Sequence, residues 1–345
     1  MKRLLILGVN GFIGHHLSRA VLERTDWHVY GMDLGTERLA EVLGSDRFHF
    51  VEGDITINRE WIEYHIKKCD IVMPLVAIAT PKTYVERPLD VFELDFEANL
   101  EIVRRCAHYG KRLVFPSTSE VYGMCPDPLF KEDASPLVTG PICKERWIYS
   151  SAKQLLDRVI WASGKHRGLR FTLFRPFNWI GPRLDSLETA KEGSSRVVTQ
   201  FIASMLKRDP IMLVDGGSQR RCFTDIRDGI DALMAILLDE KGACNGRIFN
   251  IGNPGNDCSV RELANQLQGL FRQHPDHAGD KEYSEIREVH SREFYGEGYQ
   301  DIMTRTPDIT AARTALGWEP KIGLTEALKY TLNAFLDEAK ANGGK

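Results

Sequence analysis

The first half of the chain alternates short apolar runs with longer segments in which apolar residues recur at helical spacing. The runs predict strands over residues 3–7, 28–32, 48–51, 71–75, 112–116 and 171–174. Between them, the spacing predicts helices over residues 13–23, 90–108 and 148–163. Strands that alternate with crossover helices are typical of an α/β fold with a doubly wound parallel sheet.

The pattern loosens after about residue 178 into loops that contain Pro, Gly and Ser. Helices are still predicted over residues 197–207, 227–238 and 260–271, with a closing helix over 324–341. The polar segment 274–297 is interpreted as a loop or lid. We therefore expect a first domain over residues 1–177 and a smaller C-terminal α/β lobe over 178–345, with some exchange of strands and helices back to the first domain.

Composition narrows the class of protein. The 345 residues are 43% hydrophobic and 27% charged, which is ordinary for a globular protein. The net charge of -3 does not indicate the excess of basic residues that binding to nucleic acid or to an anionic membrane would need. No apolar stretch reaches the length of a membrane span, so a cytoplasmic location without a membrane partner is expected. The seven cysteines and ten histidines lack metal-ligand spacing, and no metal site is predicted.

Three glycines follow the first predicted strand, as Gly8-x-x-Gly11-x-x-Gly14. In this context they allow a tight turn and a close approach of the backbone to a pyrophosphate at the helix N-terminus. Asp33 ends the second strand, where a carboxylate binds a ribose diol and disfavours a 2′-phosphate. A Rossmann-like NAD site is predicted from Gly8, Asn10, Gly11, Phe12, Ile13, Gly14, Asp33, Asp54 and Ile55. For Asp54, contact with the adenine amino group and capping of the next helix remain equally open.

Tyr149 and Lys153 stand four residues apart on a predicted helix, so both side chains lie on one face. A nearby ammonium favours the phenolate, and it is expected to lower the pKa of Tyr149 enough to make the phenol a base near neutral pH. The string Ser117-Thr118-Ser119-Glu120 ends an apolar run. Together with the dinucleotide motif, these residues predict hydride transfer at a substrate hydroxyl, with Tyr149 and Lys153 also contacting the cofactor.

These motifs resemble those of extended short-chain dehydrogenases/reductases that act on nucleotide sugars, over nearly the whole chain. The resemblance implies that Thr118, Tyr149 and Lys153 form the catalytic set. It makes Asn99 either a structural or proton-relay residue or an ordinary helical Asn. Sugar-nucleotide 4,6-dehydratases have Asp where this chain has Ser119, and plant UDP-apiose/xylose synthases have Cys there, so dehydration and ring contraction are both disfavoured.

Within that family the chain is most similar to UDP-glucuronate decarboxylases of the polymyxin-resistance type, which serve the 4-amino-4-deoxy-arabinose modification of lipid A. The similarity lies in Ser119-Glu120 and in the strings 146–150, 175–179, 221–228 and 298–301. It implies NAD-dependent oxidative decarboxylation of UDP-glucuronate to UDP-4-keto-pentose (UDP-L-threo-pentopyranos-4-ulose) and CO2. It also implies a homodimer or higher oligomer, and a formyltransferase domain that is fused or separate in the natural system.

The same resemblance assigns Ser119, Glu120 and Arg305 to the decarboxylation step, with Arg305 as carboxylate clamp or proton donor and Glu120 as an acid or base near C5. It places the UDP-sugar against Tyr84, Asn178, Arg196 and Arg221, and less firmly against Lys144. Three alternatives remain open: a UDP-xylose synthase that recycles its NADH, a UDP-sugar 4-epimerase, and an NAD-binding scaffold without catalysis.

Overall fold

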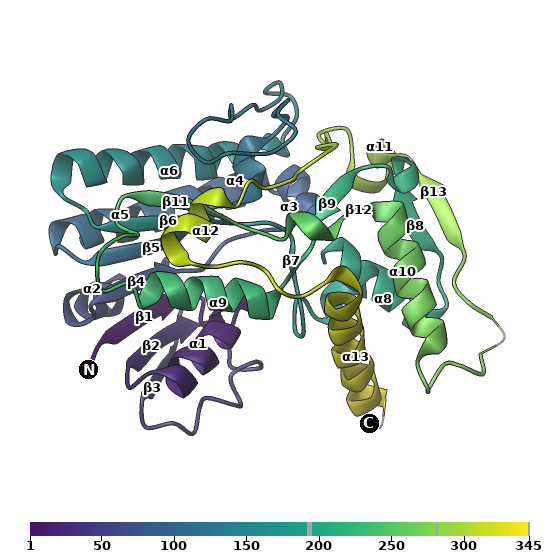
Figure 1. Cartoon of the computed structure of the whole chain (residues 1–345), viewed down its shortest axis with the longest axis horizontal. Coiled ribbons are helices and arrows are strands. Elements are labelled where there is room, and N and C mark those ends of the chain that lie inside the picture. Colours follow the sequence, from purple (N-terminus) through teal and green to yellow (C-terminus); the bar gives the residue numbers. More distant parts are fainter. Residues whose placement is uncertain (192–194, 281, 344–345) are drawn as a thin grey trace.

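The computed structural model describes residues 1–191, 195–280 and 282–343, which form a large α/β body with a smaller lobe beside it (Figure 1). The body contains a seven-stranded sheet in the order β11-β6-β5-β4-β1-β2-β3, and every neighbouring pair is parallel. Its strands are β1 (Arg3–Leu7), β2 (His28–Asp33), β3 (Phe48–Glu52), β4 (Ile71–Pro74), β5 (Arg112–Pro116), β6 (Phe171–Pro176) and β11 (Arg247–Ile251). The predicted doubly wound α/β fold is confirmed.

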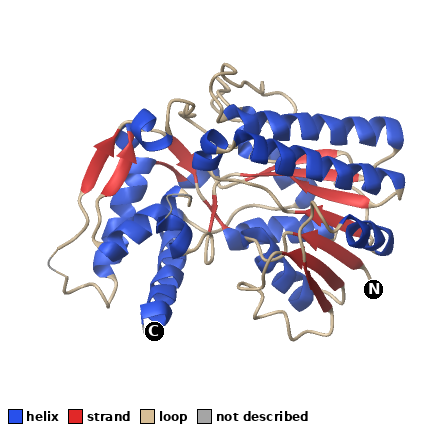
Figure 2. Cartoon of the chain, turned by 180° about the vertical axis from the view of Figure 1, so that it is seen from behind, coloured by secondary structure: helices blue, strands red, loops and turns tan. Residues whose placement is uncertain are grey.

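Helices cover both faces of this sheet, as the view from behind also shows (Figure 2). One layer contains α1 (Phe12–Arg24) and α9 (Ile226–Leu237); the other contains α2 (Arg59–Lys68), α5 (Asn99–His108) and α6 (Trp147–Arg167). Successive residues of a strand point to opposite faces, and β1 follows this rule. Leu4 and Ile6 pack in the first layer, whereas Leu5 and Leu7 pack in the second. Burial on both faces explains why the strands are almost wholly apolar.

The smaller lobe combines three helices with short strand pairs. The helices are α8 (Val197–Lys207), α10 (Val260–Gln273) and α13 (Leu324–Gly343), and β8 (Ile211–Val214) pairs with β13 (Ile286–Val289), while β9 (Arg220–Cys222) pairs with β12 (Asp257–Ser259). The interpretation of residues 274–297 as a loop is therefore partly wrong, because this segment contains β13 and α11 (Ser291–Tyr295). The two middle residues of β13 are exposed, so backbone pairing with β8 holds the strand without an apolar alternation.

The predicted helix over residues 90–108 consists of three consecutive segments. These are α4 (Pro88–Phe92), a π-helical segment η1 (Glu93–Ala98) and α5. The remaining elements are α3 (Pro81–Glu86), η2 (Ser119–Tyr122), β7 (Trp179–Ile180), α7 (Leu187–Lys191), η3 (Asp215–Gly217), β10 (Thr224–Asp225), η4 (Pro254–Asn256) and α12 (Thr310–Leu316). Among the described helices, none is both long and apolar enough to cross a membrane.

Segments beyond residue 178 return to the large body. β11 completes the sheet beside β6, and α9 packs against α1. Asp228 of α9 also anchors the chain that leads to α13, because its carboxylate accepts the backbone N–H groups of Lys321 and Ile322, each at 3.0 Å. The domain boundary at residue 177 stays a prediction. The two parts exchange elements, because β11 and α9 follow this boundary in the sequence and pack in the large body.

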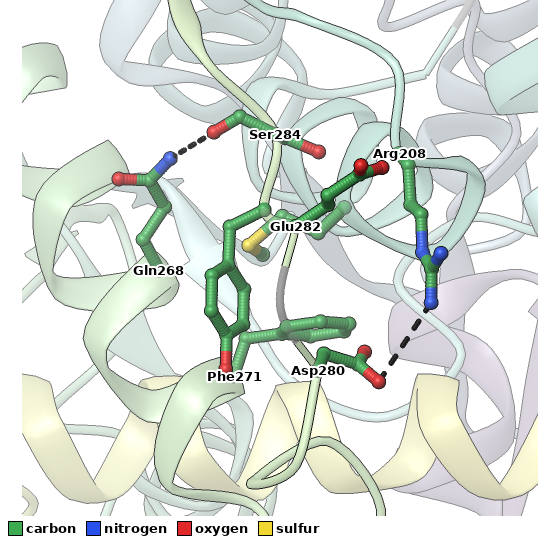
Figure 3. Close-up of a pocket in the computed structure, with 8 residues that line it drawn as sticks. Arg208, Gln268, Phe271, Asp280, Glu282 and Ser284 are labelled. Atoms are coloured by element: carbon green, nitrogen blue, oxygen red, sulfur yellow. Dashed lines mark hydrogen bonds and ion pairs between the residues drawn. The ribbon is translucent and has the colours of Figure 1, made fainter.

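A small hollow lies in the smaller lobe between α8, α10 and the chain near Ser284 (Figure 3). Its volume of about 10 Å³ leaves room for one water at most. The lining residues bond to one another. Gln268 Nε2 donates to the Ser284 carbonyl at 2.6 Å, and Arg208 Nη2 lies 3.7 Å from Asp280 Oδ1 in an ion pair. This hollow is a packing feature of the lobe.

Candidate active site

A cleft of about 420 Å³ opens beside the carboxyl ends of the strands, with lining residues from the large sheet and from the smaller lobe. The strand order reverses between β1 and β4, which is where open parallel sheets bind ligands. The predicted residues that line it are Gly8, Gly11, Phe12, Ile13, Gly14, Tyr84, Thr118, Ser119, Glu120, Tyr149, Lys153, Asn178, Arg196, Arg221 and Arg305. The fold therefore gathers most of the residues that the sequence selected.

At one end of the cleft the glycine motif forms the nucleotide turn, residues 8–14. Gly8 has a φ of +90°, and a Cβ added to Gly14 would lie 2.4 Å from the Gly8 carbonyl oxygen. Gly11 caps α1 without a side-chain hydrogen bond, and the cleft reaches the following residues Phe12 and Ile13. The first N–H groups of α1 are thus left for a ligand, and a helix N-terminus of this kind attracts anions. This cradle fits a pyrophosphate.

Asp33 lies next to the nucleotide turn at the end of β2. Its Oδ2 accepts the backbone N–H of Asn10 at 2.7 Å, and its Oδ1 accepts that of Leu34 at 2.8 Å. The side chain of Asn10 in turn donates to Glu37 at 2.5 Å. Asp33 and Asn10 do not line the main cleft, but their mutual contact fixes a carboxylate beside the turn, where a ribose diol fits.

Asp54 does not cap the next helix. Its Oδ1 accepts both the backbone N–H and the hydroxyl of Thr56, each at 2.7 Å, whereas Asn58 is the residue that precedes α2. The capping interpretation is wrong because Asp54 closes a turn five residues before α2 begins at Arg59. Asp54 and Ile55 both lie outside the lining of the main cleft, and their contact with adenine stays a prediction.

Tyr149 and Lys153 lie one turn apart on α6 and both face the cleft. Tyr84 stacks on Tyr149, with ring centroids 4.6 Å apart and planes 7° apart. Burial raises the pKa of Tyr149, the charge of Asp95 raises it further, and a hydrogen bond with Thr118 lowers it in part. The phenol is therefore protonated at neutral pH in the ligand-free cleft.

The pKa of Tyr149 is raised in the ligand-free cleft, not lowered as the presence of Lys153 suggested from the sequence. Lys153 Nζ lies 6.0 Å from the Tyr149 ring centroid and donates to the Pro116 carbonyl at 3.4 Å. Burial also lowers the pKa of Lys153, with Asp95 and Asp157 opposing that effect. The expectation failed because spacing along a helix cannot weigh the loss of hydration that both groups suffer in a closed site.

At the other end of the cleft Glu120 is held by two guanidinium groups. Its Oε2 accepts from Arg146 Nη2 at 2.6 Å, and its Oε1 accepts from Arg305 Nη1 at 2.5 Å. Burial raises the pKa of Glu120, but Arg146, Arg305 and Arg221 outweigh burial and lower it to about 2. Glu120 is therefore a carboxylate near neutral pH, and in the ligand-free cleft it has no proton to donate.

We call Arg146, Arg221 and Arg305, together with Glu120 and Asp301, the arginine cluster. Arg221 Nη2 donates to Asp301 at 2.8 Å, so three guanidinium groups face two carboxylates and one positive charge is left over. Nε and Nη1 of Arg146 and Nε of Arg305 are buried and have no hydrogen-bond partner among the described residues. The surplus charge suits the cluster to a further anion, which can reach Arg221 and Arg305 because both line the cleft.

Arg146 has no predicted role from the sequence, although it belongs to the 146–150 string. A signal was available: Arg146 stands three residues before Tyr149, a spacing that places both side chains on the same side of a helix. In the structure, the backbone N–H of Arg146 bonds to the Gly298 carbonyl, and the Trp147 indole donates to Gln300 at 2.9 Å. The start of α6 is thus fixed against the 298–301 string.

Other predicted residues have protein partners that limit their roles. Arg196 lines the cleft, but its Nε and Nη2 bond to Asp185 Oδ1 at 3.0 and 2.7 Å. Lys144 donates to the Glu297 carbonyl at 2.6 Å and does not line the cleft. Asn99 is buried and donates to two backbone carbonyls, which is the contact pattern of a structural residue.

Comparison with known proteins assigns the family. Residues 4–252 match the model of the "NAD dependent epimerase/dehydratase family". The chain belongs to this family. It is therefore an NAD-dependent enzyme of the epimerase/dehydratase type, and the predicted cofactor, NAD, is confirmed. In this structure the nucleotide turn and Asp33 are the residues that would hold it.

Several solved structures are also similar to this chain. The PbgP3 protein from Burkholderia pseudomallei is 55% identical, with a TM-score of 0.88 over 99% of this chain and 98% of that chain. The UDP-glucuronic acid 4-epimerase from Bacillus cereus, in complex with UDP-glucuronic acid and NAD, is 22% identical with a TM-score of 0.81 over 97% and 99%. A dTDP-glucose 4,6-dehydratase from Bacillus anthracis is 20% identical, with a TM-score of 0.79 over 99% and 98%. The last two share the fold.

Proposed function

We propose that this chain is an NAD-dependent UDP-glucuronate decarboxylase that forms UDP-4-keto-pentose, CO2 and NADH. The observation that carries the proposal is the arginine cluster beside Tyr149. Its surplus positive charge, with Arg221 and Arg305 lining the cleft, matches the carboxylate that distinguishes a uronate from a neutral hexose. The UDP-glucuronic acid bound by the Bacillus cereus epimerase of the same fold supports a substrate of this class.

The chemistry depends on oxidation before bond cleavage. NAD, when bound, supplies the acceptor for the hydride of C4. Once C4 is a ketone, the C6 carboxylate lies β to it, and the electrons of the C5–C6 bond can move into the ketone as CO2 leaves. An enolate then remains, and C5 must receive a proton. The protein has to orient the carboxylate and stabilise the enolate oxygen.

Side chains at two places in the cleft can remove the proton, stabilise the enolate oxygen and orient the carboxylate. Tyr149 removes the proton of the C4 hydroxyl, and Tyr149 and Thr118 then hydrogen-bond the oxygen at C4. Arg305 holds the C6 carboxylate beside Ser119, whose Oγ lies 3.4 Å from Arg305 Nη1, while Arg146, which does not line the cleft, binds Glu120 from behind. Because Glu120 is already ionised between these arginines, we assign it to orienting them, and a proton for C5 has to come from a neighbouring donor.

The proposal can be tested by incubating the protein with UDP-glucuronate and NAD, and measuring CO2, NADH absorbance and the sugar product by NMR. We expect CO2 and NADH in equal amounts together with UDP-4-keto-pentose. CO2 with UDP-xylose and no NADH would show that the ketone is reduced before release. UDP-galacturonate without CO2 would identify a 4-epimerase and overturn the proposal, as would a folded, NAD-binding protein that forms no product.

Two controls make this experiment specific. UDP-glucose has a hydroxymethyl group in place of the carboxylate, so it cannot yield CO2 and has no group to pair with the arginine cluster. The Arg313→Met variant removes an arginine that forms an exposed ion pair with Glu319, away from the cleft. We expect it to behave like the wild type, because exposed ion pairs contribute little to stability.

A further inference from the structure

Ser195 and Arg196 stand at the start of α8 in the smaller lobe, and both line the cleft. Ser195 is only 3% exposed, and its Oγ has no hydrogen-bond partner among the described residues. Gln200 Nε2 donates to the Ser195 carbonyl at 2.6 Å, so the backbone of this serine is fixed. A buried hydroxyl without a partner is costly, which points to a ligand that bonds to it in the cleft.

Arg196 is held in one orientation by Asp185. Oδ1 of Asp185 accepts from Nε and Nη2 of Arg196, and Oδ2 accepts the backbone N–H of Arg196 and the Thr199 hydroxyl, each at 2.9 Å. Nη2 also donates to the Leu184 carbonyl. Nη1 donates to no described residue, so one edge of the guanidinium can bond to a ligand. A planar guanidinium that is fixed in this way suits phosphate oxygens.

The segment 182–185 lies against the nucleotide-binding end of the cleft. On α1, His16 Nε2 lies 3.1 Å from the Pro182 carbonyl oxygen. Arg183 Nη1 donates to the Arg38 carbonyl at 2.9 Å, and Arg38 Nη1 donates to a carbonyl of the nucleotide turn at 3.3 Å. The segment that carries the carboxylate partner of the guanidinium is therefore bonded both to α1 and to the chain beside the turn.

Phe12 connects Arg196 to the N-terminus of α1. The guanidinium carbon of Arg196 lies 5.3 Å from the centroid of the Phe12 ring, within the range of a cation–π contact. Phe12 is the first residue of α1 and also lines the cleft. Since the first N–H groups of α1 fit a pyrophosphate, the guanidinium stands beside an anion-binding position.

We propose that Ser195 and Arg196 bind the pyrophosphate of NAD from the smaller lobe, together with the N–H groups of α1. The family resemblance implies contact between Arg196 and the UDP-sugar, but the Phe12 ring and the bonds of segment 182–185 favour the cofactor. Both lobes then supply part of the NAD site. The inference goes beyond the proposed function, because NAD is the cofactor of the family whichever sugar is converted.

The test measures NAD affinity by isothermal titration calorimetry without a sugar substrate. Arg196→Met should raise the Kd for NAD by about 10-fold, because a charge-assisted hydrogen bond is lost. Ser195→Ala should raise it by about 3-fold, as expected for a neutral donor. Arg196→Lys should fall between Arg196→Met and the wild type, since it keeps the charge without the planar fork. Arg313→Met is the control and should leave the Kd unchanged.

Two further measurements separate NAD from UDP. UDP is titrated with NAD at saturation, so that the cofactor is bound in every variant, and its Kd should be the same in Arg196→Met and the wild type. ³¹P NMR of bound NAD should show displaced pyrophosphate signals in Arg196→Met and unchanged signals in Arg313→Met. Thermal unfolding without ligands checks that each variant is folded, which we expect because 37% of the Arg196 side chain is exposed.

Three results would overturn the inference. A weaker affinity for UDP with an unchanged affinity for NAD would assign Arg196 to the substrate diphosphate. An equal loss of both affinities would show a general effect on the cleft, and no loss of NAD affinity in either Arg196→Met or Ser195→Ala would show that neither residue binds the pyrophosphate. If the wild type bound no UDP, the proposed substrate class would fail instead, and the NAD titrations would still decide this inference.

Discussion

The two ends of the cleft are built by different physical means. At the nucleotide turn the backbone provides the site: three glycines within seven residues set the chain path, and the N–H groups at the start of α1 are left open. At the arginine cluster, side chains from η2, from the residue that precedes α6, from β9 and from the segment after residue 300 meet and neutralise one another in part. The first end depends on the absence of side chains, and the second depends on their charge.

This contrast explains why the two ends should respond differently to substitution. Under the proposed function, changes at the turn should act through shape on the cofactor, whereas changes at the cluster should act through charge on the carboxylate of the substrate. Tyr149 lines the same cleft as both ends and is the proposed base, so its loss should affect the whole reaction.

Tyr149→Phe should have the largest effect. Removal of the hydroxyl eliminates the proposed base, and we expect NADH formation from UDP-glucuronate to fall by about 10³-fold or more. The ring still stacks on Tyr84, so folding and NAD affinity should be retained. Stopped-flow absorbance measures the first quantity, and NAD titration measures the second. A variant that keeps its activity would refute the assignment of Tyr149 as base.

Glu120 should control the acid stability of the arginine cluster. Its pKa is about 2 in the folded protein, below its ordinary value in an unfolded chain of about 4.3. A carboxyl with a lowered folded pKa stabilises the fold above its unfolded pKa, and this contribution disappears as the pH falls toward the folded value. The contribution lost in acid is therefore about 3 kcal/mol.

Chemical denaturation at several pH values can measure this contribution. The unfolding free energy of the wild type should exceed that of Glu120→Gln near neutral pH, and the difference should shrink between about pH 5 and pH 2. Glu319→Gln is the matched control, because it removes a carboxylate from an exposed ion pair with Arg313. A difference between wild type and Glu120→Gln that does not vary with pH would contradict the electrostatic account of the cluster.

Arg305→Met should separate decarboxylation from cofactor binding. Its loss removes a donor to the substrate carboxylate, and we expect CO2 release to fall by about 10²-fold. Because the nucleotide turn contains none of the arginines, NAD affinity should stay unchanged, as it should in the Arg313→Met control. If Arg305→Met weakened NAD binding as strongly as it slows CO2 release, the two ends would not be independent.

The contiguous turn could be predicted from the sequence, whereas the arginine cluster could be predicted only in part, because its side chains come from separate elements. The nucleotide turn is contiguous, and six of the seven strands of the large sheet lie in the predicted places, because each element shows its own periodicity. β11 escaped prediction as a short run after a glycine-containing loop, and η1 escaped because a π-turn alters the helical spacing by little. Arg146 was missed as a member of the arginine cluster because its partner Glu120 lies 26 residues earlier in the sequence.

Two glycines of the nucleotide turn give the most local test and the smallest predicted effect. A Cβ on Gly14 would lie 2.4 Å from the Gly8 carbonyl oxygen, a backbone atom that cannot move without opening the turn. A Cβ on Gly11 would approach the same oxygen only to 3.1 Å. We therefore expect Gly14→Ala to destabilise the protein by about 1–3 kcal/mol and to weaken NAD binding. Gly11→Ala should cost less in both respects.

Thermal unfolding and NAD titration of both variants measure these effects. The test is which of the two variants is damaged more, and the absolute size of each effect matters less. The turn's function depends on a space that only glycine leaves open, so the tighter contact must be the more damaging one. CO2 release at saturating NAD should recover in Gly11→Ala, because the arginine cluster is unaffected by that change. If Gly11→Ala proved more harmful than Gly14→Ala, the close approach of α1 to β1 would not be what shapes this end of the cleft.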